Sequence, residues 1–130
     1  MYPNYTNPLY PASLPDPYVL KHAGEYWAYG SEKGCDGRFF KILHSLDLLH
    51  WQEVGGALDE QPGGHTCYWA PEVVYWNGCF YLYYSLGNEA HMTIRVASAP
   101  TPDGPFEDHG LNLTQEPFAI DAHVFEDDDR

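Results

Sequence analysis

Two aspartates, Asp16 and Asp121, combine a residue type and a spacing that could do chemistry. Each opens a phrase in which two residues of varied type precede a Val and a second apolar residue, Val19-Leu20 after one and Val124-Phe125 after the other. Two carboxyl groups in one cavity can divide proton transfer, one taking a proton from water while a carboxylic acid protonates a leaving oxygen. An Asp before a Pro, such as Asp16, is also a common turn residue, so a purely structural role is the alternative.

A third copy of this phrase, Ala70 to Val74, lies between the two aspartates and shows that the chain repeats. It starts 54 residues after Asp16 and 51 residues before Asp121. Three further kinds of segment recur at an offset of 54 or 55: a turn Gly with an aromatic strand, an apolar strand, and an aromatic residue followed by polar residues and Gly. They pair 24–30 with 78–84, 40–45 with 94–99, and 49–55 with 104–110. One unit is four short strands in about 50 residues, which is typical of a β-propeller blade.

The repeats predict an all-β fold in which the chain forms one partial β-propeller domain, residues 1–130. We place the first blade at about 16–66, the second at about 67–117 and the start of the third at about 118–130. Aromatic residues make up 16% of the chain, and 12 Gly and 11 Pro suit many tight turns. The innermost strand of each blade runs beside the propeller axis, so Asp16 and Asp121 should project into one central funnel. Two blades cannot close a ring, which predicts open apolar faces and self-association through them.

Net charge is −13, from 6 Lys and Arg against 19 Asp and Glu. This makes nucleic acid and anionic membranes poor partners and does not exclude neutral ligands such as sugars. The first residues lack the basic-then-apolar segment of a secretion signal, which predicts a cytoplasmic location. Three widely spaced cysteines indicate neither a zinc site nor a disulfide framework. We expect no metal site and no cofactor in this chain, and leave a structural calcium or other ion to the full-length propeller.

The chain resembles glycoside hydrolase family 43, whose members are five-bladed β-propellers acting mainly on arabinose- and xylose-containing polysaccharides. The resemblance covers nearly the whole chain, in the family's order and roughly its spacing. The stretches that carry it are Asn7-Pro8-Leu9 with Asp16-Pro17-Tyr18-Val19 (first-strand motif), Trp69-Ala70-Pro71-Glu72-Val73 (Trp-Ala-Pro motif), Ala119-Ile120-Asp121 with Val124-Phe125 (third acidic motif), and the outer-strand phrases at 45–51 and 97–106.

The resemblance implies a hydrolase of O-glycosyl bonds that works by single-step inversion. Asp16 would be the general base that activates water, and Asp121 would orient the general acid and keep its pKa raised. The family's acid is a Glu about one repeat beyond the Asp121 position, and only nine residues follow Asp121 here. We therefore expect the general acid to be absent from this chain and the chain alone to be inactive.

Trp69 and Ala70 are candidate substrate-binding residues beside the predicted funnel. An indole face can pack on the C–H face of a sugar, and the alternative for Trp69 is a core position between blades. Ala70 takes the place of the Asp in the other two units, where a small side chain leaves room for substrate. Glu72 matches Tyr18 and His123 in the repeat rather than the aspartates, so we assign it no catalytic role.

Two other interpretations stay open: a non-catalytic carbohydrate-binding or structural propeller, and another five-bladed glycosidase or phosphorylase family. A Glu about one repeat beyond Asp121 in the longer gene would favour the enzyme. The Trp-Ala-Pro phrase and Ile120-Asp121 favour family 43. The expected partner is a carbohydrate, an arabino- or xylo-oligosaccharide.

Overall fold

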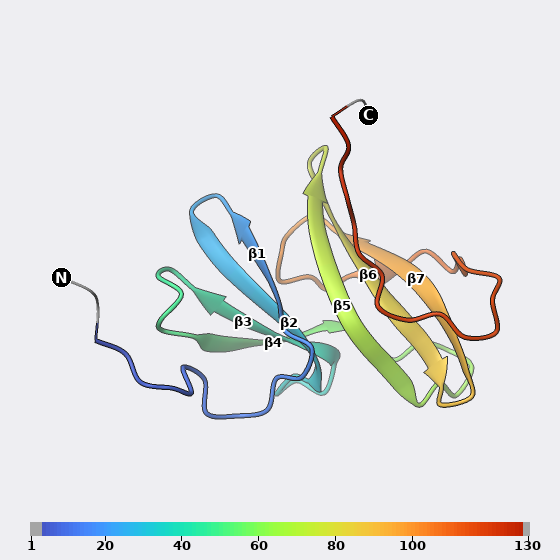
Figure 1. Ribbon diagram of the computed structural model, residues 1–130, viewed down its shortest axis with the longest axis horizontal. Helices are drawn as coiled ribbons and strands as arrows, with labels where there is room; N and C mark the ends of the chain where they lie inside the picture. Colours follow the sequence, from blue (N-terminus) through green and yellow to red (C-terminus); the bar gives the residue numbers. More distant parts are fainter. Residues whose placement is uncertain (1–3, 129–130) are drawn as a thin grey trace.

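The computed structural model describes residues 4–128, which form eight β-strands and the loops between them. The strands make two four-stranded antiparallel sheets, each with its strands in chain order (Figure 1). Since the described residues contain no helix, none is long and apolar enough to cross a membrane. The strands are β1 (Tyr18–His22), β2 (Glu25–Lys33), β3 (Phe39–Ser45), β4 (Gln52–Leu58), β5 (Cys67–Trp76), β6 (Cys79–Asn88), β7 (His91–Ala99) and β8 (Glu107–Asp108).

Each sheet is one propeller blade and begins with the same kind of hairpin. Ala23-Gly24 joins β1 to β2 and Asn77-Gly78 joins β5 to β6, and all four residues have positive φ angles, between 50° and 84°. Two-residue hairpin turns with left-handed central residues match the twist of the strands that they connect. The two turns lie 54 residues apart, so the repeat seen in the sequence is a repeat of structure.

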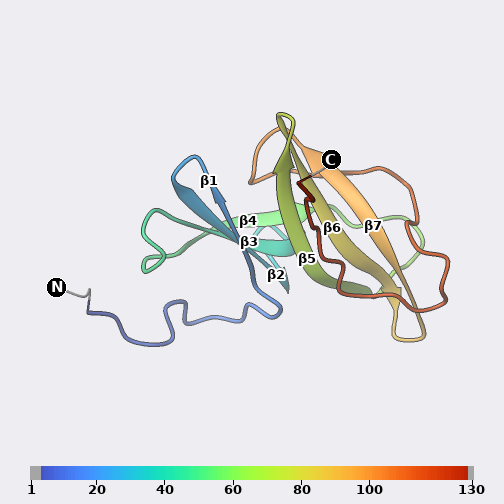
Figure 2. The same cartoon turned by 45° about the horizontal axis from the view of Figure 1, so that its top comes forward.

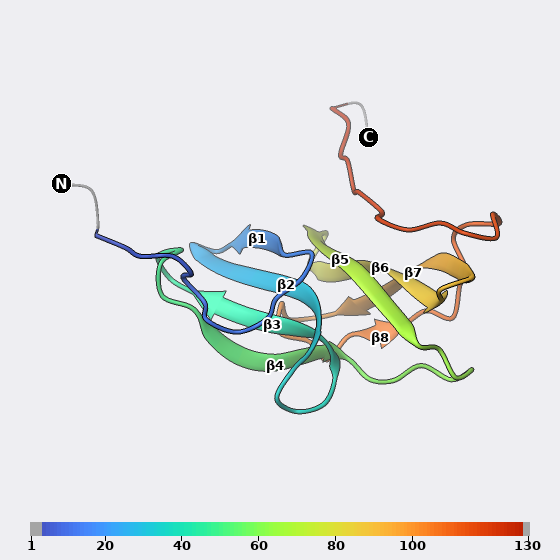
Figure 3. The same cartoon turned by 60° about the horizontal axis from the view of Figure 1, so that its bottom comes forward.

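The two blades lie side by side (Figures 2 and 3). They share one hydrophobic core. Phe40 of β3 and Tyr84 of β6 meet edge to face, with ring centroids 5.2 Å apart. At the outer edge, the Phe106 N–H donates to the carbonyl oxygen of Ala57 at 2.8 Å, which links the end of β4 to the segment before β8. Burial of these large side chains stabilises the blade pair and thereby holds β1 and β5, the two innermost strands, next to each other.

Residues 121–128 run as extended chain alongside β5 without forming a named strand (Figure 1). A strand needs a hydrogen-bonded neighbour, and the predicted neighbour is the second strand of a third blade. The segment before it is anchored to blade 2, because the Ala119 N–H donates to the Met92 carbonyl oxygen at 3.0 Å. The chain therefore forms two complete blades and the start of a third.

An open apolar groove of about 680 Å³ lies between β1, β5, β6 and residues 124–126. Trp76 and Phe125 line it with 55% and 79% of their surface exposed. Apolar faces of this kind are covered by neighbouring blades in a closed ring. Self-association through them stays a prediction.

Candidate functional site

Asp16, Ala70 and Asp121 share one unusual backbone conformation. Their φ angles are +51°, +46° and +61°, in the left-handed region. Asp adopts this region more readily than most residues, whereas for Ala it costs roughly 1–2 kcal/mol. In blade 2 the conformation coincides with a β-bulge between Trp69 and Glu72. Each unit therefore makes the same sharp turn at this position, which lies before β1 in blade 1 and within β5 in blade 2.

This turn brings the three equivalent residues to one cavity of about 130 Å³. Its walls come from three short segments, residues 16–18, 70–72 and 121–122. Asp16 and Asp121 are both exposed, so a ligand from solvent can reach their carboxylates. The cavity is thus lined by an Asp from unit one, an Asp from unit three, and Ala70 and Glu72 from unit two.

Ser31 at the end of β2 ties Asp16 to the second blade. Its hydroxyl donates to Asp16 Oδ2 at 2.8 Å and accepts a hydrogen bond from the Ala70 N–H at 2.8 Å. Ser85 on β6 repeats half of this arrangement, because its hydroxyl accepts from the Asp121 N–H at 3.2 Å. The sequence reasoning missed both serines. The two serines lie 54 residues apart and directly follow the repeated aromatic segments 24–30 and 78–84. This shared offset was the signal in the sequence that could have found them.

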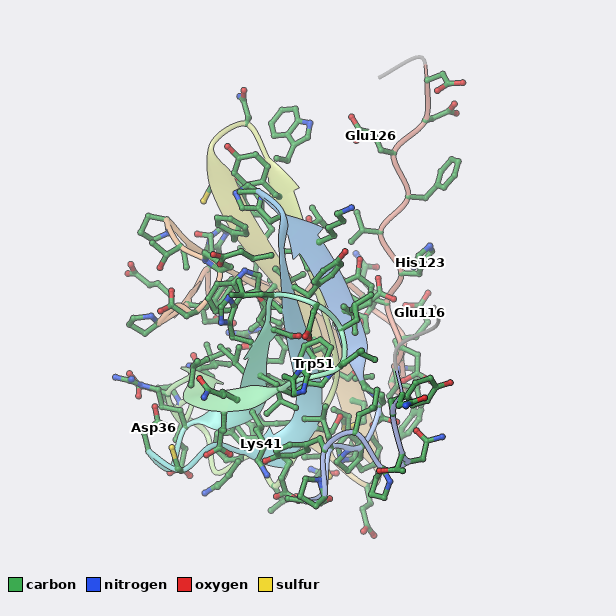
Figure 4. All side chains as sticks on the ribbon, turned by 90° about the vertical axis from the view of Figure 1, so that its left-hand side faces the viewer. Asp36, Lys41, Trp51, Glu116, His123 and Glu126 are labelled. Carbon is green, nitrogen blue, oxygen red and sulfur yellow. The ribbon has the colours of Figure 1, made fainter. Side chains whose placement is uncertain are left out.

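Glu72 lines the cavity of the two aspartates and also holds the third unit against the second. Its carboxylate accepts a hydrogen bond from the Val124 N–H at 3.2 Å and lies 3.1 Å from His123 Nδ1. His123 lies on the C-terminal segment that stands to one side of the blades in Figure 4. Burial, and secondly the negative charge of Glu72, raise the pKa of the Tyr18 hydroxyl. Through these contacts Glu72 stabilises the position of the third unit against blade 2.

Trp69 lies outside the cavity of the two aspartates. It is half-buried and lines a neighbouring hollow of about 280 Å³ between the blades. In that hollow the rings of Phe39 and Tyr68 stack with centroids 3.6 Å apart. Ser31 borders both spaces, because it lines the hollow and bonds to Asp16. Ala70, in contrast, lines the aspartate cavity itself.

Within residues 4–128, no group of three or more His, Cys, Asp or Glu side chains is arranged to hold a metal ion. In the described residues, Asp16 Oδ2 accepts a hydrogen bond from the Ser31 hydroxyl, and the Asp121 N–H donates to the Ser85 hydroxyl. The described part of the site is therefore built from carboxylates and neutral hydrogen-bonding groups.

The repeated turn, the two carboxylates and the two blades agree with a match to a known family, Glycosyl hydrolases family 43, over residues 5–130. The chain belongs to this family. A β-D-galactofuranosidase of Aspergillus niger is 27% identical over 95% of the chain and 42% of its own length. A probable arabinan endo-1,5-α-L-arabinosidase B of Aspergillus oryzae is 30% identical over 73% of the chain and 28% of its own length. The chain thus spans well under half of these relatives.

Solved structures of similar proteins share the fold. A thermostable family-43 glycoside hydrolase is 38% identical, with a TM-score of 0.83 over 97% of the chain and 42% of that protein. An endo-1,4-β-xylanase from Bacteroides thetaiotaomicron is 37% identical, with a TM-score of 0.75 over 89% of the chain and 40% of that protein. The fold is a five-bladed β-propeller of family 43, of which this chain supplies two blades and the start of a third.

Proposed function

We propose that the protein containing this chain is an inverting glycoside hydrolase that cleaves arabinose- or xylose-containing glycosides. The observation that carries the proposal is the cavity shared by Asp16 and Asp121, whose carboxylates come from equivalent positions in two different units. Membership of Glycosyl hydrolases family 43 supports the same reaction class.

In this mechanism Asp16 is the general base and Asp121 positions the general acid. Ser31 holds Asp16 Oδ2, and Asp16 Oδ1 would take the proton from the attacking water. The acid would be a Glu from the part of the propeller beyond Arg130, held about 6.5–9.5 Å from Asp16 so that water fits between the base and the sugar. Asp121 would keep that acid protonated until it donates to the leaving oxygen.

The substrate class rests on the relatives. An arabinan endo-1,5-α-L-arabinosidase and an endo-1,4-β-xylanase are among them, and both names describe pentose polymers. The β-D-galactofuranosidase adds a second furanose sugar. Ala70 leaves the cavity open for the sugar ring, and we propose Trp69 as a platform for the next sugar, since its hollow adjoins the Ser31–Asp16 contact.

The test is a substrate panel for the whole protein. Aryl α-L-arabinofuranoside, β-D-xyloside and β-D-galactofuranoside are compared with arabinan and xylan, and NMR records the first anomer released. Hydrolysis with inversion, lost in Asp16→Asn, supports the proposal. Retention of configuration contradicts the mechanism. Binding of the polymers without any hydrolysis would establish the non-catalytic carbohydrate-binding propeller instead.

A further inference from the structure

The Ser31 hydroxyl joins the candidate base to the neighbouring blade through two hydrogen bonds, one donated to Asp16 Oδ2 and one accepted from the Ala70 N–H, both 2.8 Å long. We propose that Ser31 is a positioning residue that fixes the Asp16 carboxylate relative to blade 2. The inference rests on the proposed function and deepens it, because it explains how an exposed carboxylate is kept in one orientation.

A serine hydroxyl has one hydrogen to donate and two lone pairs to accept with. In Ser31 the hydrogen is committed to Asp16, and the Ala70 N–H restricts the direction of the lone pairs. The hydroxyl cannot turn without losing one of the two bonds. An exposed Asp otherwise samples several rotamers, and a displacement of about 1 Å in a reacting group can cost about 10²-fold in rate.

The backbone around Ser31 also holds the segment that carries Asp16. The Ser31 N–H donates to the Pro15 carbonyl oxygen at 2.8 Å. The residue before it is Gly30, where an added Cβ would lie 2.7 Å from the Leu14 side chain and 2.9 Å from the Pro15 oxygen. Only a residue without a side chain lets the incoming chain lie this close to β2. The same strand, β2, therefore holds both the carbonyl group of Pro15, next to Asp16, and the Asp16 carboxylate.

Comparison of the two blades distinguishes the Ser31–Asp16 hydrogen bond, which positions the carboxylate, from the hydrogen bonds that only join one blade to the next. Ser85 takes the Ser31 place in blade 2 and accepts from the Asp121 N–H at 3.2 Å. A hydrogen bond donated by the next unit's N–H to a serine hydroxyl thus occurs twice. Within the described residues, a serine at this place donates to a carboxylate of its own unit at Asp16 alone, because the equivalent residue in blade 2 is Ala70. The second contact is specific to the unit with the candidate base.

The experiment compares Ser31→Ala, Ser31→Thr and a control, Ser98→Ala, in the whole protein. Ser98 lies on β7, where its hydroxyl contacts His109 Nε2 at 2.7 Å, away from the cavity. Hydrogen exchange at the Ala70 amide should speed up in Ser31→Ala and stay unchanged in the other two. The kcat of Ser31→Ala should fall about 10- to 100-fold with KM nearly constant, and Ser31→Thr should retain most of the rate.

A double-mutant cycle with Asp16→Asn distinguishes positioning from a general structural role. If Ser31 acts through Asp16, Ser31→Ala causes no further loss of kcat once Asp16 is replaced. An equal loss in both backgrounds, or unchanged Ala70 exchange in Ser31→Ala, overturns the inference. If the wild-type protein hydrolyses nothing in the panel, the proposed function fails, and Ala70 exchange alone decides whether Ser31 forms the bridge.

Discussion

The carboxylate of Asp108 on β8 accepts hydrogen bonds from the guanidinium group of Arg95 on β7, and both side chains are largely buried, with 5% and 16% of their surface exposed. The Tyr84 hydroxyl on β6 donates to the same carboxylate. Blade 1 has a looser counterpart at the equivalent positions, where Lys41 Nζ lies 3.7 Å from Glu53. An ion pair across the outer strands is thus a repeated feature, and it is tighter in blade 2.

Replacement of Asp108 by Asn should lower the free energy of unfolding by about 3 kcal/mol at neutral pH, because it leaves a mostly buried guanidinium group without its charged partner. Glu53→Gln should cost less, because the Lys41–Glu53 pair is longer, at 3.7 Å, and Lys41 Nζ keeps its hydrogen bond to the Ser13 carbonyl oxygen. Urea denaturation of the two variants measures both values. Equal effects of the two substitutions would contradict the ranking by the closeness of the contacts.

The contribution of Asp108 should depend on pH. Burial alone would raise its pKa, but the hydrogen bonds from Arg95 and Tyr84 outweigh burial and hold the pKa below its usual value. A carboxyl group with a lowered pKa contributes its full stabilisation above its unfolded-state pKa of about 4. The contribution disappears as the pH falls through the lower folded-state pKa. The stability difference between wild type and Asp108→Asn should therefore stay constant from neutral pH to about pH 4 and shrink below it.

Asp16→Asn should lower kcat by about 10²–10⁴-fold in the whole protein, since the variant cannot accept a proton from water. KM should change little, because the amide keeps the size of the carboxylate. Asp59→Asn is the matched control, as Asp59 is 73% exposed and pairs with Arg38 on the surface. Steady-state kinetics on an aryl glycoside decide the point, and a fully active Asp16→Asn would remove Asp16 from the mechanism.

Ala70→Gly and Ala70→Asn should separate backbone strain from cavity volume. Gly and Asn both tolerate the φ angle of +46° better than Ala, so both variants should keep the melting temperature within a few degrees. Only Asn fills the 130 Å³ cavity, and it should reduce kcat/KM at least tenfold. An active Ala70→Asn variant would show that the sugar does not occupy this space.

Trp69→Ala should raise KM for oligosaccharides about tenfold, equivalent to about 1.4 kcal/mol of lost binding. Trp76→Ala is the control, because Trp76 ends the same strand and lines the apolar groove instead. Comparison of an aryl monosaccharide with a trisaccharide isolates the effect, which should appear only with the longer ligand. An equal rise in KM for both ligands would point to a structural role of Trp69.

The isolated chain of 130 residues should show no turnover above background, because it offers the candidate base and the orienting Asp without the proposed acid. The assay uses the substrates cleaved by the whole protein, with circular dichroism to show that the chain retains its β-structure. Turnover by the pure, folded chain would mean that the acid lies within these residues.

Much of the fold could be predicted from the repeat offset. The hairpin turns, the order of the strands and the all-β class follow from turn residues and aromatic runs, and the structure and the relatives confirm the propeller. The strand expected after Asp121 has no ladder, because pairing depends on a neighbour and not on the sequence of the strand alone. The catalytic roles of Asp16 and Asp121 stay predictions.

The geometry of the site was less accessible from the sequence. An alanine gives no signal of a left-handed conformation, since Ala disfavours it, and at Ala70 the surrounding packing imposes the bulge. The Ser31–Asp16 hydrogen bond joins a residue of β2 to a residue just before β1, and no local sequence pattern predicts it. The position of Trp69 beside rather than within the aspartate cavity depends on the direction of a half-buried side chain at the same bulge.

The shared left-handed turn at Asp16, Ala70 and Asp121 bears on how such a protein could evolve. At Ala70 and Asp121 the backbone is supported by a contact that does not involve the side chain, because each N–H group donates to a serine hydroxyl. Duplication of a blade would therefore copy a backbone turn that holds one side chain beside the propeller axis. A single codon change at that residue then adds or removes a carboxyl group without a new loop. Active and silent blades can then arise from one ancestral unit by substitution at one residue.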